Sequence, residues 1–363
     1  MPFEEFISYN PPLAPLCSLE LGGPARYLVE ALDEETVIGA LHWARECGIA
    51  VIVLGGGSNV VIADRGFDGL VVLMVQRGIE MRREGGAVRI TAQAGEPWDP
   101  FVQLTVSEGL AGIECLSGIP GLVGAVPVQN VGAYGQEVSE TISSVRVLDR
   151  KTLKISEMAP KECRFAYRTS IFKNEQADRF VILAVSFTLL PGGPAAVRYA
   201  ELKSAIGASN VEPTLAHARE AVIALRRRKS MVFDPTDENR RSVGSFFLNP
   251  VVSAEKATYI VENTLSDGVV SNSYDIPQFP VEGGKVKLAA GWLLEHAGVR
   301  MGKRRGPVGV SSRHVLALVH HGGGTTSELL EFARHVRNAV AERFDVMLKP
   351  EPVLIGFAKD DPL

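Results

Sequence analysis

A glycine- and proline-rich stretch, GIECLSGIPGLVGAVPVQNVGAYG, occupies residues 112–135 and constrains the fold more than any other segment. It holds six glycines and two prolines, and Glu114 is its one formal charge. Glycine is favoured where the backbone approaches another group closely or adopts a positive φ. The composition therefore favours main chain pressed against a large, flat, partly apolar ligand. A buried irregular crossover inside a large domain explains it equally well, and this segment alone leaves both interpretations open.

The length and charge of the chain limit the classes of protein to consider. A chain of 363 residues predicts two or three domains, because single cores rarely exceed about 250–300 residues. The net charge of −4 provides no basic surface for nucleic acid or anionic membrane, and no apolar run is long enough to span a bilayer. The first residues lack the features of a signal peptide. We therefore expect a cytoplasmic enzyme that binds neither nucleic acid nor membrane.

The cysteines indicate neither a metal site nor a disulfide framework. Four are present, and they form no C-x-x-C pair and have no nearby histidine at ligand spacing. This agrees with a reducing compartment. The scattered positions are Cys17, Cys47, Cys115 and Cys163.

Hydrophobic periodicity and capping residues predict helices and strands along the whole chain. Asp33 is the expected N-cap of a helix to Glu46, and Thr325 with Glu328 forms a capping-box pattern for a helix to Arg343. Further helices are expected at 97–109, 215–229 and 288–297. Strands are expected at 50–54, 70–75, 88–94, 145–148, 180–189 and 353–355.

Two other segments suit anionic ligands. The strand at 50–54 is followed by Gly-Gly-Gly-Ser-Asn, a turn whose successive N–H groups can point at a phosphate with no Cβ in the way. It matches neither the Walker nor the Rossmann spacing, and a plain turn explains it as well. The helix 215–229 ends in Arg226-Arg227-Arg228-Lys229, which complements the helix dipole, with phosphate binding as the alternative.

Six motif segments follow one another along almost the whole chain. They are LGGGSN at 54–59, SGIPGLVGAVPVQNVGAYG at 117–135, CRFAYRTSIFK at 163–173, GSFFLNPVV at 244–252, LAAGWLLEHAG at 288–298 and KPEPVLIG at 349–356. In this order they resemble the UDP-N-acetylenolpyruvoylglucosamine reductase (MurB) family. The segment around Tyr199, VRYAEL, resembles the longer, type I branch of that family.

The resemblance implies an α+β protein with an FAD-binding fold of the PCMH/vanillyl-alcohol-oxidase type in two lobes, plus a separate α+β substrate-binding domain. The implied lobes are residues 1–69 joined by 346–363, and residues 70–230, with the substrate domain at 231–345. It also implies a monomeric cytoplasmic flavoenzyme with noncovalent FAD and NADPH as co-substrate. Its reaction is the reduction of UDP-N-acetylglucosamine enolpyruvate to UDP-N-acetylmuramate in peptidoglycan synthesis.

The resemblance also assigns roles to residues. Ser245 is the expected proton donor, after hydride has come from N5 of reduced FAD. Arg168 and Glu351 are expected to stabilise the enolate, with Glu351 protonated or its charge taken up by Arg168. The residues expected to contact FAD are Gly55, Gly56, Gly57, Ser58, Asn59, Ser117, Gly118, Ile119, Gly124, Ala125 and Tyr167. Those expected to bind substrate are Tyr199, Lys229, Asn249 and His296.

Some positions depart from the family pattern, and two other functions compete. Leu248 stands where a lysine is common, and His296 replaces a frequent glutamine, so the detailed substrate contacts are left open. Cys17-Ser18-Leu19 replaces the usual Asn-Thr-Phe. An alcohol oxidase of the same fold would need a base near the flavin and often a covalent flavin link. A nonenzymatic nucleotide-binding module would not need Arg168, Ser245 and Glu351 together.

Overall fold

The structure is a computed structural model that describes residues 3–207, 212–266, 272 and 276–358. Its backbone forms two compact units, each built from separate stretches of chain. The first comprises Met1–Pro11, Ala25–Gly57 and Asp68–Phe233, and the second comprises Pro12–Pro24, Ser58–Phe67 and Asp234–Leu363. The expected lobe at residues 1–69 is therefore shared between the two units, and the three-part division stays a prediction.

The first unit begins with a small sheet in the strand order β1-β2-β5-β3, covered by one helix. Its elements are η1 (Phe3–Phe6), β1 (Ser8–Tyr9), β2 (Ala25–Ala31), α1 (Glu34–Glu46), β3 (Val51–Leu54) and β5 (Phe67–Met74). The predicted cap of α1 is confirmed, because the Asp33 carboxylate accepts the Thr36 N–H at 2.7 Å. The predicted strands at 50–54 and 70–75 are confirmed as β3 and β5.

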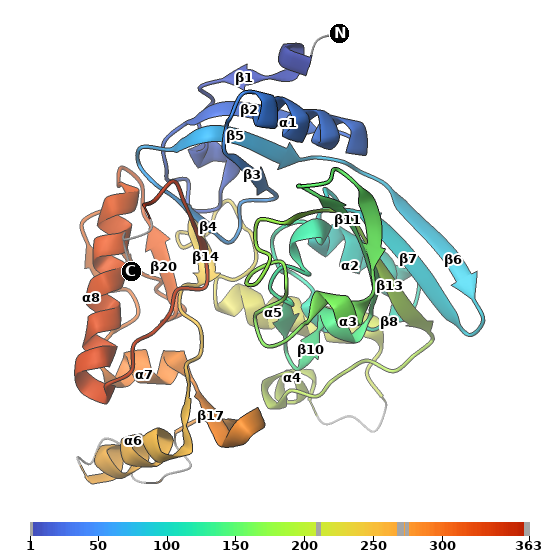
Figure 1. Cartoon of the computed structure of the whole chain (residues 1–363). Helices are drawn as coiled ribbons and strands as arrows, with labels where there is room; N and C mark the ends of the chain where they lie inside the picture. Colours follow the sequence, from blue (N-terminus) through green and yellow to red (C-terminus); the bar gives the residue numbers. More distant parts are fainter. Residues whose placement is uncertain (1–2, 208–211, 267–271, 273–275, 359–363) are drawn as a thin grey trace. The chain divides into compact units, whose positions relative to one another are not determined.

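A larger antiparallel sheet follows in the order β12-β11-β13-β7-β6, with β8 pairing the end of β13. Figure 1 shows β11, β13 and β7 side by side. The elements are β6 (Ile79–Glu84), β7 (Ala87–Gln93), α2 (Trp98–Ser107), β8 (Leu110–Ala111), β11 (Ile142–Asp149), β12 (Ile155–Met158), α3 (Pro160–Cys163) and β13 (Phe180–Pro191). The expected helix at 97–109 and the expected strands at 88–94, 145–148 and 180–189 are confirmed.

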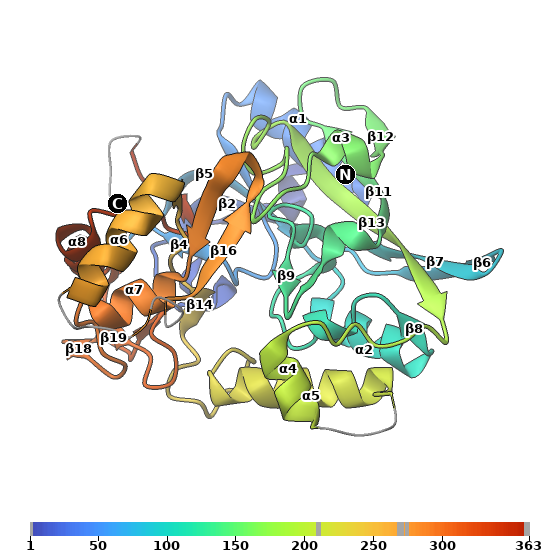
Figure 2. The same cartoon turned by 90° about the horizontal axis from the view of Figure 1, so that it is seen from below.

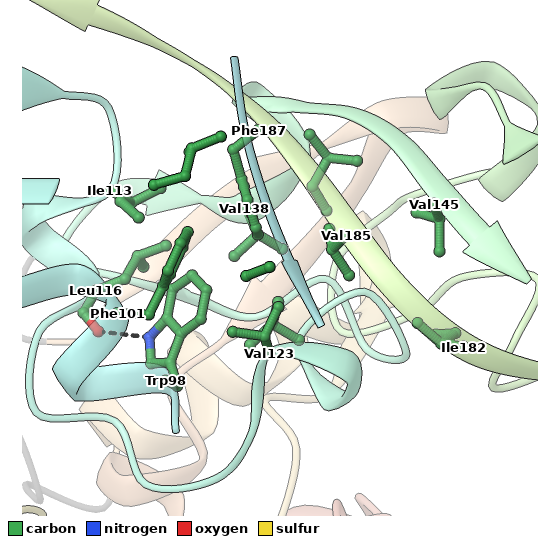
Figure 3. Packing of buried hydrophobic residues seen from close by; sticks show 14 of the residues in the cluster. Trp98, Phe101, Ile113, Leu116, Val123, Val138, Val145, Ile182, Val185 and Phe187 are labelled. Atoms are coloured by element: carbon green, nitrogen blue, oxygen red, sulfur yellow. Dashed lines mark hydrogen bonds between the residues drawn. The ribbon is translucent and has the colours of Figure 1, made fainter. Parts of the chain in front are cut away.

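The glycine-rich stretch folds against this sheet as short irregular elements. They are η3 (Glu114–Leu116), η4 (Val123–Ala125) and β9 (Gly132–Ala133), and the stretch is followed directly by β10 (Gln136–Glu137) and η5 (Val138–Glu140). Leu116 and Val123 enter the same buried cluster as Trp98, whose indole Nε1 donates to the Leu116 carbonyl at 2.9 Å (Figure 3). The first half of the stretch is thus largely buried against this sheet, and its contact with a ligand stays a prediction.

A helical pair completes the first unit. The pair consists of α4 (Ala200–Ile206) and α5 (Leu215–Arg228), and α4 lies against α5 in Figure 2. Leu202 of α4 and Val222 and Leu225 of α5 form a small core with Cys115 of η3. This core attaches the helical pair to the glycine-rich stretch.

The second unit contains two antiparallel sheets, in the orders β14-β20-β19-β18 and β15-β17-β16, and the parallel pair β21-β4. The elements are η2 (Ala14–Leu16), β4 (Val60–Ile62), β14 (Ser242–Ser245), β15 (Val251–Ser253), α6 (Ala254–Ser266), β16 (Gln278–Val281), η7 (Glu282–Gly284), β17 (Lys285–Leu288), α7 (Ala290–His296), β18 (Arg304–Arg305), β19 (Val308–Val310), β20 (Ala317–His320), α8 (Thr326–Phe344) and β21 (Val353–Ile355). Leu288 ends β17 instead of opening a helix, because its N–H bonds to the Pro250 carbonyl. None of the described helices is long and apolar enough to cross a membrane.

Helix α8 is fastened to the chain segment 58–67. The predicted capping box of Thr325 and Glu328 is present. The Asp64 carboxylate accepts the N–H groups of Thr326 at 2.7 Å and Ser327 at 2.9 Å, so a negative charge lies at the helix N-terminus. This pairing explains how an early segment belongs to a unit built mostly from the end of the chain.

Gly66 permits a close backbone approach in the same region. Its φ is +77°, and a Cβ added to it would lie 1.8 Å from the carbonyl oxygen of Pro24. A Cβ on Gly356 would in turn lie 2.0 Å from the carbonyl oxygen of Gly66. Three stretches of backbone meet there without room for a side chain.

We predict that Gly66→Ala lowers the free energy of unfolding by more than about 3 kcal/mol, because backbone atoms must move apart. The matched control is Gly306→Ala, where φ is +60° but no atom lies within 4 Å of the added Cβ. This control should cost about 1 kcal/mol for the left-handed conformation alone. Urea unfolding of both variants measures the difference, and equal losses would contradict the close approach.

Candidate functional site

The glycine turn after β3 presents backbone N–H groups that the described part of the chain leaves without a hydrogen-bond acceptor. This holds for Gly55, Gly56 and Gly57, and Gly57 is buried with a φ of +60°. A Cβ on Gly56 would lie 3.1 Å from the Cα of Gly121, so this turn and the glycine-rich stretch are in close backbone contact. Buried N–H groups normally have a partner, and an anion is a suitable one. The turn therefore fits a phosphate group.

Ser58 and Asn59 continue this turn into the second unit. The carbonyl of Asn59 accepts the N–H of Val353 at 3.0 Å, next to the β21-β4 pair. This hydrogen bond fixes the backbone of the turn at its C-terminal end.

The other expected cofactor residues lie in the glycine-rich stretch, where the chain itself uses most of their polar groups. The Ser117 hydroxyl donates to the Glu114 carbonyl at 2.6 Å, and the Gly118 N–H donates to Asp99 at 2.6 Å. Gly124 has no room for a side chain, because its Cβ would lie 2.5 Å from that of Ala94. The half-buried Ile119 packs on the apolar cluster, and Ala125 is exposed.

Arg168 is held in a strained backbone conformation beside the glycine-rich stretch. Its φ is +53°, and its Nη2 donates to the Gly132 carbonyl at 2.6 Å. Its guanidinium lies 5.5 Å from the ring centroid of Tyr167. Left-handed conformations at non-glycine residues cluster at functional sites. The structure thus brings together Arg168, Tyr167 and the stretch that the sequence analysis selected.

Two expected substrate residues lie close to each other on the helical pair. Tyr199 is the N-cap of α4, is 45% exposed and packs edge-on against Tyr134, with ring centroids 6.0 Å apart. Lys229 ends α5, and its Nζ pairs with Glu201 of α4 at 2.8 Å. A half-exposed phenol and an ammonium group are thereby presented by neighbouring helix ends.

Arg226 is a functional candidate that was not among the residues selected from the sequence. Its Nη2 donates to the Met231 carbonyl at 2.7 Å, whereas its buried Nε has no partner among the described residues. Burial lowers the pKa of Arg226 to about 10, a direction that indicates desolvation of a cation. A Cβ on Gly118 would lie 3.5 Å from that Nε. The basic run at 226–229 could have pointed to an anion-binding role for Arg226, but the helix dipole explained that run equally well.

Asp99 lies next to this arginine and is already neutralised by another. Arg219 binds both of its carboxylate oxygens, at 2.6 and 2.9 Å. Burial by itself would raise the pKa of Asp99, but the bonds from Arg219 and from the Gly118 N–H, together with Arg226, lower it. Asp99 is therefore a charged partner of Arg219, and Arg226 retains capacity for an external anion.

In the second unit, the chain around Ser245 runs antiparallel to the chain around Glu351. The Glu351 N–H donates to the Phe246 carbonyl at 2.9 Å, and the Leu248 N–H donates to the Lys349 carbonyl at 2.9 Å. Gly244, with a φ of +75°, turns the chain just before Ser245. The half-buried Ser245 hydroxyl makes no hydrogen bond to the described residues. Two of the three expected catalytic residues are thus backbone neighbours.

Asn249 and His296 both lie at helix α7. The Asn249 Oδ1 accepts the Ala290 N–H at 2.9 Å and so caps the helix. The His296 ring stacks on Trp292, with ring centroids 3.9 Å apart, and its Nδ1 donates to the Trp292 carbonyl at 2.8 Å. That bond requires the proton on Nδ1, and Nε2 has no partner among the described residues.

Comparison with known proteins places these features in a family. The profile of the UDP-N-acetylenolpyruvoylglucosamine reductase C-terminal domain matches residues 234–355, and that of the FAD binding domain matches residues 25–153. The reductase of Saccharopolyspora erythraea is 48% identical over 95% of this chain and 95% of its own length. That of Mycobacterium tuberculosis is 44% identical over 95% of this chain and 94% of its own.

The chain belongs to the UDP-N-acetylenolpyruvoylglucosamine reductase family. As a MurB protein it is an FAD-containing oxidoreductase of peptidoglycan synthesis, which decides against the alcohol oxidase and the nonenzymatic module. The crystal structure of MurB from Thermus caldophilus has the same fold, with a TM-score of 0.62 and 21% identity over 96% of this chain and 98% of that one. The expected α+β FAD-binding fold is confirmed.

We predict that Gly56→Val weakens FAD binding by MurB at least about tenfold, because the side chain forces the turn away from Gly121. The matched control is Gly86→Val in the β6–β7 hairpin, where no atom lies within 4 Å of the added Cβ. FAD titration of both apoproteins measures the effect. Unchanged affinity in Gly56→Val would remove the turn from the cofactor site.

Proposed function

We propose that this chain catalyses the NADPH-dependent reduction of UDP-N-acetylglucosamine enolpyruvate to UDP-N-acetylmuramate. The observation that carries the proposal is the antiparallel backbone pairing of the chain at Phe246 with that at Glu351, which brings the segment of Ser245 next to the segment of Glu351. An enzyme that adds hydrogen across a C=C bond needs a positioned proton donor and a group that stabilises the enolate. FAD, when bound and reduced by NADPH, supplies the hydride from N5.

Ser245 donates the proton to the enolate carbon. A serine hydroxyl is a weak acid, but an enolate carbon is a strong base, so alignment is the main requirement. The turn at Gly244 supports this role, as does the absence of an acceptor for the Ser245 hydroxyl among the residues that the structure describes. Ser245 therefore needs no protein base to activate it.

Arg168 and Glu351 stabilise the charge that develops on the enolate and its carboxylate. A guanidinium offers a planar fork of donors that matches a carboxylate. The strained backbone and the fixed bond to Gly132 support preorganisation of Arg168. Glu351 acts in its protonated form or with its charge taken up by Arg168, because a lone carboxylate would repel the enolate.

The uridine diphosphate is bound by cations and by the half-exposed phenol of the first unit. Lys229 attracts the phosphates together with the buried charge of Arg226 behind it, and Tyr199 covers the substrate. From the second unit, Asn249 offers its amide and His296 its Nε2. A single hydrogen bond to either residue would serve orientation more than affinity.

Gly55–Gly57, with Ser58 and Asn59, would hold the FAD pyrophosphate, and residues of the glycine-rich stretch would hold the remainder of the cofactor. The N–H groups of Gly55, Gly56 and Gly57, which have no acceptor among the described residues, support this assignment. Those remaining residues are Ser117, Gly118, Ile119, Gly124 and Ala125, together with Tyr167. The enzyme acts in the cytoplasm as a monomer, with an N-terminal lobe, a second FAD lobe and a substrate domain at 231–345.

The function is tested by the absorption spectrum of the purified protein. We expect a yellow protein that is bleached by NADPH without oxygen and regains its colour when UDP-N-acetylglucosamine enolpyruvate is added. UDP-N-acetylglucosamine is the matched control, because it lacks the double bond, and should restore nothing. Reoxidation by the control sugar, or none by the enolpyruvate, would overturn the proposal.

Ser245→Ala separates the two half-reactions. Flavin reduction by NADPH should stay within about twofold of wild type, while reoxidation by the enolpyruvate slows by at least about a thousandfold. Anaerobic stopped-flow absorbance measures both rates on one preparation. Equal losses in the two half-reactions would exclude Ser245 as the proton donor.

A further inference from the structure

The one acidic residue of the glycine-rich stretch, Glu114, is completely buried, with 0% of its surface exposed. One carboxylate oxygen, Oε2, accepts the N–H of Gly112 at 2.8 Å. The other, Oε1, accepts the N–H of Ala196 at 2.7 Å and the amide of Gln136 at 3.3 Å. All three partners are donors, which matches a group that acts only as an acceptor.

No lysine, arginine or histidine of the described residues forms an ion pair with Glu114. A carboxylate buried without a cation is costly unless amide donors replace its hydration. A neutral residue would meet the packing requirement without this cost. The retained carboxylate therefore points to a task beyond filling space.

The partner Ala196 leads directly to Tyr199, the half-exposed phenol of the substrate site. The carbonyl of Ala196 also accepts a hydrogen bond from the Cys115 thiol at 3.4 Å. The backbone N–H and C=O of Ala196 are therefore both bonded to side chains of η3. The pair Arg198–Glu140, at 2.8 Å, holds the next turn of chain. The exposed Arg198–Glu140 pair adds little by itself. The buried bond to Glu114 is the strongest polar contact of this segment, and it acts together with the packing of Ala196 and Val197 on the core of the helical pair.

We propose that Glu114 is a positioning residue that holds the Tyr199 segment in its substrate-binding arrangement through the Ala196 N–H. The proposal rests on the proposed function, because it requires Tyr199 to contact the UDP-linked substrate. Glu114 itself touches neither substrate nor cofactor. It holds the segment from the buried side. Less conformational entropy is then lost when the substrate binds.

Glu114→Gln keeps the shape of the side chain but turns one of the two acceptor groups into a donor. The new NH2 must face either the Gly112 N–H or the donors at Ala196 and Gln136. We expect the apparent Kd of reduced enzyme for the enolpyruvate substrate to rise about tenfold, with NADPH reduction of FAD within about twofold of wild type. Stopped-flow reoxidation at varied substrate concentration measures this split.

Asp149→Asn is the matched control, since it also neutralises a buried carboxylate of the first unit. Asp149 accepts two bonds from Arg179 and the N–H groups of Lys151 and Thr152. It ends β11, whereas Tyr199 is the N-cap of α4. It should lower thermal stability without moving the substrate Kd. If Glu114→Gln and Asp149→Asn affect the two half-reactions alike, Glu114 has only a structural role and the inference fails.

A double-mutant cycle with Tyr199→Ala tests the route of the effect. If Glu114 acts through Tyr199, adding Glu114→Gln to Tyr199→Ala should change the substrate Kd by less than about twofold. A further tenfold loss would show that Glu114 acts elsewhere and would overturn the proposal. Failure of wild-type enzyme to be reoxidised by the enolpyruvate would instead refute the proposed function, so the two failures are distinct.

Discussion

Buried backbone that forms no helix or sheet must still have hydrogen-bond partners for its N–H and C=O groups. This requirement determines the structure of the glycine-rich stretch and its neighbours. Buried polar side chains supply the partners that a regular ladder would otherwise provide. Glu114 accepts the N–H groups of Gly112 and Ala196, which are distant in sequence, and Asn130, 1% exposed, accepts the Ser139 N–H and donates to the Ala166 carbonyl. These bonds provide partners for backbone groups that lie outside a regular ladder.

The same region contains several non-glycine residues with left-handed backbone. Asn130, Tyr134, Arg164 and Arg168 have φ between +46° and +53°. Each such conformation costs free energy that surrounding contacts must offset. At Arg168, the bond from its guanidinium to the Gly132 carbonyl is one such contact. A rigid arginine loses little entropy when it binds a carboxylate, which suits a group that stabilises a transient charge.

Local signals predicted most regular elements, and the site needed more than local signals. Capping residues such as Asp33 and Thr325 predicted the start of their helices, because a cap is a contact between near neighbours in sequence. The resemblance placed Ser245 and Glu351 in one site, and nothing in their spacing could reveal that their backbones pair. Arg226 was not selected from the sequence, because the basic run that contains it was already explained by the dipole of its own helix. Glu114 stood out as a lone charge, yet its partner Ala196 is distant in sequence.

The pairing of β4 with β21 has a consequence for synthesis of the protein. Val60 lies beside Val353, so β4 obtains its strand partner only after residues 353–355 have been synthesised. Until then Val61 and Ile62, which are completely buried in the finished fold, lack part of their surroundings. The first unit is drawn mainly from earlier residues and can form sooner. The second unit is thus completed after the first, and β4 stays without a ladder partner until then.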